Sequence, residues 1–195
     1  MKIGNFMADG IRGKEHFNME TDIKNGVILH REIDTFTDSH RIYLESKHRL
    51  SKKYDHYSGV IMDILYDHFL AKNWQKYSDE TLENYADNFY KLLVNNTNLL
   101  TVRTKNLLPY MIDQNWLVSY STIAGIEKIL FQMDYRTKHR VNMHEAIVEL
   151  QQYYNEFEEE FTRFFEELKE YCIDFSNANG FNKNNFDENI ELFAD

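Results

Sequence analysis

A histidine and two aspartates recur at helical spacing in the first quarter of the chain. His30, Asp34 and Asp38 are each four residues apart, so a helix over residues 21–38 would carry all three on one face. The same face begins with two apolar residues, Ile23 and Val27. An imidazole and two carboxylates that continue an apolar face can coordinate a cation or exchange a proton.

A second pair of aspartates lies about thirty residues further on. Asp63 and Asp67 are four apart on a predicted helix that is otherwise apolar. Like charges at this spacing repel by about 0.2–0.5 kcal/mol even on an exposed helix, and moving them into an apolar interior adds several kcal/mol per ion unless a positive charge compensates. A bound divalent cation would compensate both groups. The alternative is a buried hydrogen-bond network without a metal.

The composition predicts a single soluble domain with an all-α fold. Of the 195 residues, 43% are hydrophobic and 15% aromatic, enough to bury one sizeable core. One proline and seven glycines favour long helices over a turn-rich β fold. The single cysteine excludes an internal disulfide and suits a reducing compartment. Because no apolar run is long enough for a membrane helix and no signal peptide is evident, we expect a cytoplasmic protein.

The net charge of −10 is concentrated at the C-terminal end. Residues 156–195 contain twelve acidic and three basic residues, which leaves the rest of the chain close to neutral. In that remainder, the predicted helix over 41–53 is locally basic. Its cations are Arg41, Lys47, Arg49, Lys52 and Lys53. They form either a solvated helix face or a docking patch for an acidic partner; nucleic acid is a weaker candidate because the overall charge opposes it.

Helical periodicity continues through the rest of the chain, with no segment rich in β-forming residues. We predict helices that begin at Ser58 and Ser78, one that starts or kinks at Pro109, an amphipathic stretch over 116–133 and a long helix over 143–172. These elements form a helical bundle over residues 1–175. An acidic, asparagine-rich tail follows over 176–195, with a short helix at 186–193.

Other chemistries lack their sequence signatures. The chain has no glycine-rich phosphate loop, no Cys-x-x-Cys pair and no nucleophile-elbow serine. Cys172 lies among glutamates, which raise the pKa of a thiol and make it a poor nucleophile. Four histidines stand alone among polar residues and are interpreted as surface residues. They are His16, His56, His139 and His144.

The motifs, in this order, resemble those of the acyl carrier protein phosphodiesterases, also called acyl carrier protein hydrolases. The likeness rests on Gly4-Asn5 to Asp9, Arg12-Gly13, His30-Arg31-x-Ile33-Asp34-x-x-Thr37-Asp38, Asp63-x-x-x-Asp67-His68-Phe69-Leu70, Trp74 and Asn115-Trp116-Leu117-Val118-x-Tyr120. It covers residues 3–172. The resemblance implies an all-helical fold related to the HD-type metal phosphohydrolases, and a divalent metal, with Mn²⁺ favoured over Fe²⁺ or Mg²⁺. The implied reaction removes the 4′-phosphopantetheine arm from the serine of the acyl carrier protein of fatty acid biosynthesis.

The sequence departs from this family at two points. Relatives usually carry a short apolar segment with a histidine ahead of the Gly-Asn motif, whereas this sequence starts almost at the motif. Full activity is therefore expected to depend on whether such a segment precedes Met1. The order Asp67-His68 also reverses the His-Asp pair that names the HD superfamily, so ligand roles are not transferred from it.

With the resemblance included, we predict roles for individual residues. Imidazole with carboxylates suits Mn²⁺ or Fe²⁺ better than Ca²⁺ or structural Zn²⁺. The expected metal ligands are His30, Asp34, Asp63, Asp67 and Asp9. Two further groups, Asp38 and His68, are expected to orient ligands or transfer protons. Arg12 and Arg31 are expected to offset charge on the phosphoryl oxygens, the alternative for each being an ion pair with a neighbouring acid.

The expected partner is holo acyl carrier protein, which is small and strongly acidic. Two acidic proteins repel at long range, so binding requires a local positive surface beside the active site. The 41–53 segment links the two predicted ligand helices, and we predict that its five cations, with Arg12 at the rim, form the docking site. Two other functions remain: hydrolysis of a small nucleotide or other phosphodiester, and non-catalytic carrier binding. No nucleic-acid or membrane partner is predicted, and the oligomeric state is left open.

Overall fold

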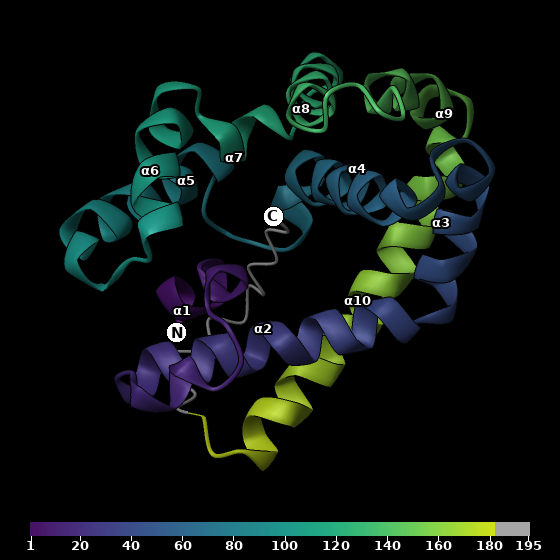
Figure 1. The fold of residues 1–195 in the computed structure, drawn as a ribbon. Coiled ribbons are helices and arrows are strands. Elements are labelled where there is room, and N and C mark those ends of the chain that lie inside the picture. The colour runs from purple at the N-terminus through teal and green to yellow at the C-terminus, as the bar shows by residue number, and fades with distance from the viewer. Residues whose placement is uncertain (182–195) are drawn as a thin grey trace.

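The helical periodicity of the sequence is realised as helices throughout residues 1–181, the part of the chain that this computed structural model describes (Figure 1). The α-helices are α1 Lys2–Phe6, α2 Thr21–Ser39, α3 Arg41–Tyr54, α4 Ser58–Lys72, α5 Leu82–Asn95, α6 Val102–Asp113, α7 Trp116–Ser119, α8 Ile123–Arg136, α9 Ala146–Gln152 and α10 Tyr154–Ala178. Short 3-10 turns include η1 Ala8–Gly10, η2 Glu15–Asn18 and η6 Met143–Glu145. No strand occurs among the described residues, so the all-α prediction is confirmed.

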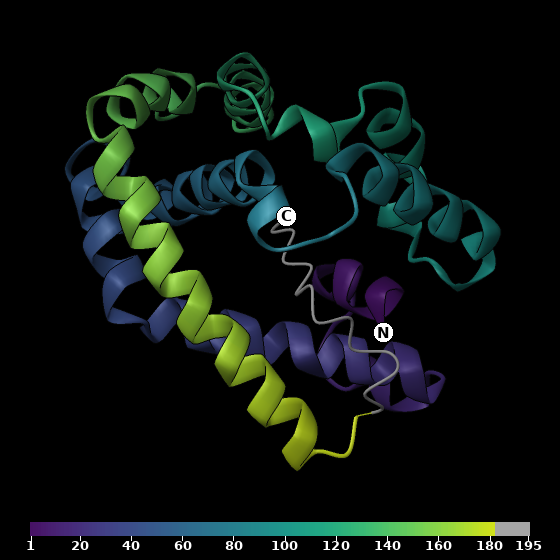
Figure 2. The ribbon, with the colours of Figure 1, turned by 180° about the vertical axis from the view of Figure 1, so that it is seen from behind.

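The core is built around α4, which is apolar on nearly all sides. Eleven of its fifteen residues are buried, among them Ile61, Leu65 and Phe69. A helix that is hydrophobic all round must be covered on every face, and α3, α8 and α10 all contact α4. Both views show α10 running alongside α3 and α2, with α5, α6 and α7 at the opposite end of the molecule (Figures 1 and 2). The same buried helix carries Asp63 and Asp67 into the interior.

The short helix α1 lies directly against the first half of α2 because two glycines face each other there. A side chain at Gly4 would collide with the backbone carbonyl of Ile23, and one at Gly26 with the carbonyl of Met1. Glycine inside a helix costs about 1 kcal/mol relative to alanine, so the close approach must offset that cost. Its consequence is that Asn5, the residue after Gly4, is brought beside His30 on α2.

Several predicted helix boundaries were wrong. The stretch 116–133 is two helices, because Thr122 caps a new one by accepting a hydrogen bond from the Gly125 amide (3.1 Å). The stretch 143–172 is interrupted at Tyr153, between α9 and α10. Pro109 lies inside α6, so the predicted start there is wrong, while the alternative, a kink, stays a prediction.

One predicted helix start also differs. Helix α5 starts at Leu82 because Thr81 provides its cap, accepting a hydrogen bond from the Asn84 amide (3.2 Å). Helix α2 begins at Thr21, as predicted, and the residue before it, Glu20, forms no side-chain cap.

The predicted tail is described only in its first residues. Helix α10 continues to Ala178, and the buried Phe181 packs against Phe175 with ring centroids 5.9 Å apart. The helix predicted at 186–193 lies outside the described residues. None of the described helices combines the length and the apolar character that crossing a membrane requires.

Three of the four histidines interpreted as surface residues have specific partners. His16 is buried and its ring packs against Phe17. His139 and His144 each place Nδ1 2.7 Å from the same oxygen of Asp134. Both His56 and His139 are exposed, so the surface interpretation is confirmed for these two. Cys172 is an inert thiol, as predicted, but the cause is burial, which raises its pKa to about 12, and not the neighbouring glutamates.

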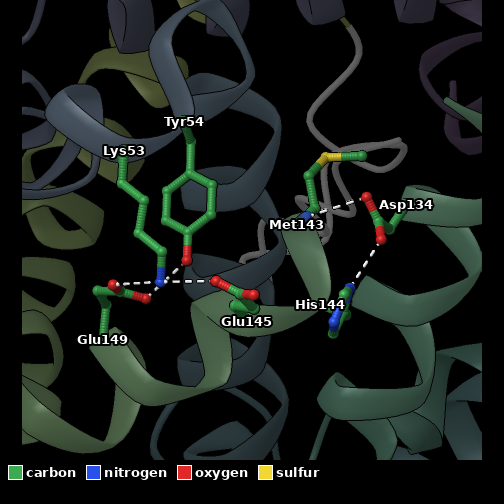
Figure 3. A network of polar contacts seen from close by, with 7 residues as sticks. All are labelled: Lys53, Tyr54, Asp134, Met143, His144, Glu145 and Glu149. Atoms are coloured by element: carbon green, nitrogen blue, oxygen red, sulfur yellow. Dashed lines mark hydrogen bonds and ion pairs between the residues drawn. The ribbon is translucent and has the colours of Figure 1, made fainter. Parts of the chain in front are cut away.

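Asp134 organises the loop that follows α8. Its carboxylate is fully buried and accepts hydrogen bonds from both histidines and from the Met143 backbone amide (3.0 Å). Figure 3 shows the contacts with His144 and Met143. Burial opposes ionisation, but the three hydrogen bonds outweigh it and lower the pKa of Asp134. The buried carboxylate therefore ties η6 to α8.

Replacing Asp134 with alanine is expected to lower the free energy of unfolding by about 2–3 kcal/mol, because it leaves buried donors without an acceptor. Urea unfolding of the Asp134→Ala protein beside wild type measures this loss. His56→Ala, at an exposed histidine, is the control and should change little. Equal stability of Asp134→Ala and wild type would show that the network contributes nothing.

Candidate metal centre

His30 is held so that one ring nitrogen faces carboxylates. Its Nδ1 lies 3.0 Å from Asn5 Oδ1, and because an amide oxygen only accepts, Nδ1 carries the proton and donates. Nε2 then faces Asp9 Oδ1 at 3.2 Å and Asp34 Oδ2 at 3.4 Å. A bare nitrogen lone pair between two carboxylates is repulsive, so this position favours a cation, either a proton or a metal ion.

The same residues line a cavity of about 310 Å³ that is rich in acids. Its carboxylates are Asp9, Asp34, Asp38, Asp63 and Asp67. None of its lining residues, all of which the structure describes, is a lysine or arginine. The acids that helical spacing placed on two separate faces therefore meet across one cavity, between α2 on one side and α4 on the other.

Burial and neighbouring negative charge raise the pKa of two of these carboxyls, Asp63 and Asp34. Burial raises the pKa of Asp63 to about 6, and the charges of Asp38 and Asp34 act in the same direction, while a hydrogen bond from the Tyr43 hydroxyl (2.7 Å) opposes them. Burial also raises the pKa of Asp34, with Asp9 and Asp38 adding to it. The site thus holds more negative charge than its own residues neutralise, and its donors, one imidazole and several carboxylates, fit a divalent metal.

Not all of the predicted ligands lie equally close together. Asp9, His30 and Asp34 have donor atoms within 4.8 Å of one another. Asp63 and Asp67 line the same cavity without belonging to that group. Their place in the coordination sphere therefore stays a prediction.

Three of the predicted catalytic residues do not line the cavity. His68 is buried, with Nδ1 2.8 Å from the Tyr120 carbonyl and Nε2 2.8 Å from the Tyr154 hydroxyl, so it joins α4 to α10. Arg31 donates to the carbonyls of Gly13 (2.9 Å) and Ile11 (3.1 Å) and holds the loop before α2. The third, Arg12, is exposed.

Sequence reasoning missed two residues that act on the site. Tyr43, a buried residue of α3, donates a hydrogen bond from its hydroxyl to Asp63. Arg103, in the first turn of α6, lies close enough to Asp9 to lower the pKa of that carboxyl, behind the larger effect of the His30 hydrogen bond. No spacing in the sequence relates position 103 to position 9, because their proximity arises from the packing of α6.

Of the five cations on the predicted docking helix α3, two form ion pairs with the C-terminal part of the fold. Arg49 binds both oxygens of Glu160 on α10 (2.6 and 2.7 Å). Lys53 bridges Glu145 (3.2 Å) and Glu149 (3.0 Å) near α9 (Figure 3). These two cations stabilise the packing of α3 against the C-terminal helices.

The other three cations of α3 have weaker attachments. Arg41 pairs with Glu45 on its own helix (3.3 Å), where both side chains are exposed. Lys52 is exposed. Lys47 has its ammonium 5.7 Å from the centre of the Tyr43 ring, and its charge reaches Asp63.

A second group of metal-capable residues lies in the loop after α8. Asp134, His139 and His144 also have donor atoms within 4.8 Å of one another. They do not line the acidic cavity, and their spacing of five and five residues has no helical period. Any measurement of metal content must therefore separate the two groups.

Asn5 is a positioning residue whose effect is measurable. Replacing it with alanine removes the acceptor that fixes the His30 tautomer, and loss of such a partner typically costs 10–100-fold in metal affinity. We expect Asn5→Ala to weaken Mn²⁺ binding about tenfold in calorimetry, with the helix content unchanged. Asn98→Ala, outside the cavity, is the matched control. Unaltered affinity in Asn5→Ala would show that the Nδ1 contact does not orient the ring.

Comparisons with known proteins agree with the order of the motifs. The profile of the acyl carrier protein phosphodiesterase family matches residues 1–168. Among curated proteins, the acyl carrier protein phosphodiesterase of Photorhabdus laumondii is 27% identical over 88% of this chain and 90% of its own length. That of Pectobacterium atrosepticum is 28% identical, over 84% and 85% respectively. No solved structure matches the chain significantly.

Proposed function

The chain belongs to the acyl carrier protein phosphodiesterase family, and we propose that it hydrolyses the phosphodiester linking 4′-phosphopantetheine to the serine of holo acyl carrier protein. The observation that supports this most directly is the acidic cavity in which His30 Nε2 lies between Asp9 and Asp34. We also propose Mn²⁺ as the metal, because imidazole with several carboxylates suits it. The single cysteine supports a cytoplasmic location.

Different residues of the chain would hold the metal and orient the groups around the phosphodiester. When bound, a divalent metal activates a water molecule and polarises a phosphoryl oxygen. Asp9, His30 and Asp34 would hold it, with Asn5 fixing the imidazole. Tyr43 would keep the Asp63 carboxylate directed across the cavity.

The leaving serine oxygen requires a proton. His68, the first candidate from the sequence, has both ring nitrogens engaged and does not line the cavity. Asp38 lines the cavity and is exposed, so it can pass a proton from water to the leaving oxygen. We therefore assign the proton transfer to Asp38.

The test is incubation of purified protein with holo acyl carrier protein and Mn²⁺, followed by intact-mass spectrometry of the carrier. The expected result is loss of the phosphopantetheine mass, abolished by EDTA and restored best by Mn²⁺ over Fe²⁺ and Mg²⁺. Unchanged carrier mass, together with turnover of bis(4-nitrophenyl) phosphate, would favour a small-phosphodiester hydrolase. Carrier that binds without any change in mass would favour a non-catalytic module.

A further inference from the structure

A second cavity meets the metal-centre cavity at Asp9. It lies between the N-terminal segment and helices α6, α7 and α8, and Asp9 lines both cavities. Small-molecule sites in proteins are mostly apolar with a few placed polar groups. The walls of the second cavity are mostly apolar and include Phe6, Leu107 and Met111.

One polar group in this wall has no hydrogen-bond partner among residues 1–181. The indole nitrogen of Trp116 is shielded from solvent, and among the described residues nothing accepts its hydrogen bond. Buried N–H groups are normally hydrogen-bonded, and an unsatisfied one indicates a missing partner. Since an indole N–H only donates, the missing partner is an acceptor such as a carbonyl oxygen.

A cation lies in the same cavity. Arg103 lines it together with Asp9, and the Arg103 charge acts on the Asp9 carboxyl. Its guanidinium is therefore near the end where the two cavities meet. A guanidinium there can pair with a phosphate whose phosphorus is at the metal centre.

We propose that this second cavity binds the pantetheine arm of the substrate, with the phosphate beside Arg103 and an amide carbonyl accepting the hydrogen bond of Trp116. The assignment rests on the proposed function. The arm carries the groups that such a cavity can bind: an anion, a dimethyl-substituted carbon and two amides in a flexible chain. Continuity with the metal centre favours this occupant over an unrelated apolar ligand.

The fluorescence of Trp116 can report ligand binding in this cavity. The chain has two tryptophans, and Trp74→Phe leaves Trp116 as the sole one. Titrating EDTA-treated Trp74→Phe protein with 4′-phosphopantetheine should change the Trp116 emission saturably. Pantetheine without the phosphate should also bind, at least fivefold more weakly. If Trp74→Phe does not fold, the difference between wild type and Trp116→Phe in the same titration gives the same readout.

Arg103→Gln isolates the phosphate contact. It should weaken binding of 4′-phosphopantetheine at least fivefold and leave binding of pantetheine within twofold. Arg140→Gln, an exposed arginine outside the cavity, is the matched control and should bind both ligands like wild type. Equal effects of the two substitutions, or no emission change with either ligand, would overturn the assignment. A response to decanoate as strong as that to phosphopantetheine would also overturn it.

The metal-free titration separates this inference from the proposed function. Arm binding that depends on Arg103, in a protein that leaves holo carrier intact, would sustain the cavity assignment while the proposed reaction fails. Hydrolysis of holo carrier without any arm-dependent change at Trp116 would leave the reaction standing and reject the cavity assignment alone.

Discussion

Replacing Asp63 with asparagine is expected to stop hydrolysis of holo acyl carrier protein and, at the same time, to raise the melting temperature of the metal-free protein. Asp63 is a half-buried carboxylate that lines one cavity with four others, and burial raises its pKa to about 6. Asparagine keeps the shape and removes the charge. Function and stability therefore respond in opposite directions at this residue.

The direction of the stability change follows from the difference between the folded and unfolded pKa of Asp63. The unfolded carboxyl titrates near 3.8, so between pH 4 and 6 the folded state holds more protons and stability falls as pH rises. At pH 7 the penalty is fully present. A shift of this size corresponds to about 2–3 kcal/mol at most, and the weakened Tyr43 hydrogen bond reduces the gain from Asn to about 1–2 kcal/mol. For a chain of this length we expect about 3–5 °C, measured calorimetrically in EDTA.

Loss of the carboxylate should lower kcat/KM for holo carrier at least about 1,000-fold, because it removes a group that supports the metal. Metal analysis of protein purified without chelator should show less metal in Asp63→Asn and unchanged metal in Asp134→Asn, which separates the two clusters. Asp113→Asn, at an exposed aspartate outside the cavity, is the matched control for both readouts. An active Asp63→Asn enzyme with full metal content would remove Asp63 from the site.

Periodicity predicted the acidic cavity because its residues lie on regular helices. His30 and Asp34 are four residues apart on α2, and Asp63 and Asp67 are four apart on α4. In the structure all four residues line the same cavity. Periodicity does not place His68 at this cavity. On a helix that is buried on every side, the neighbour of a site residue points to another part of the core.

Contacts between distant segments could not be predicted from spacing. Arg103 reaches Asp9 only because α6 packs near η1. The Asp134 group forms in a loop where Lys138, His139 and Asn142 adopt positive φ, a conformation that no periodic pattern signals. The ion pair between Arg49 of the basic helix and Glu160, one of the C-terminal acids, could not be predicted from the distribution of charge along the sequence.

Those ion pairs change how the docking prediction should be tested. Arg49 and Lys53 hold α3 to α9 and α10, so reversing their charge would destabilise the fold as well as weaken docking. Arg41, Lys47 and Lys52 are the better probes. They differ in position, since Arg41 and Lys52 are exposed whereas Lys47 acts on Asp63.

The triple variant Arg41→Glu, Lys47→Glu, Lys52→Glu is expected to lower kcat/KM for holo carrier about 100-fold at low ionic strength, because local charge can accelerate encounter 10–1,000-fold. The loss should appear mainly in KM and shrink as salt screens the surface. A control with the same change in net charge, Lys91→Glu, Lys128→Glu, Arg140→Glu, places the reversals at exposed cations on other elements. Equal losses in the two triple variants would mean that overall repulsion between two acidic proteins, and not a docking helix, governs binding. If α3 forms a positive docking surface beside the acidic cavity, only the α3 variant should lose kcat/KM. That loss should disappear at high salt.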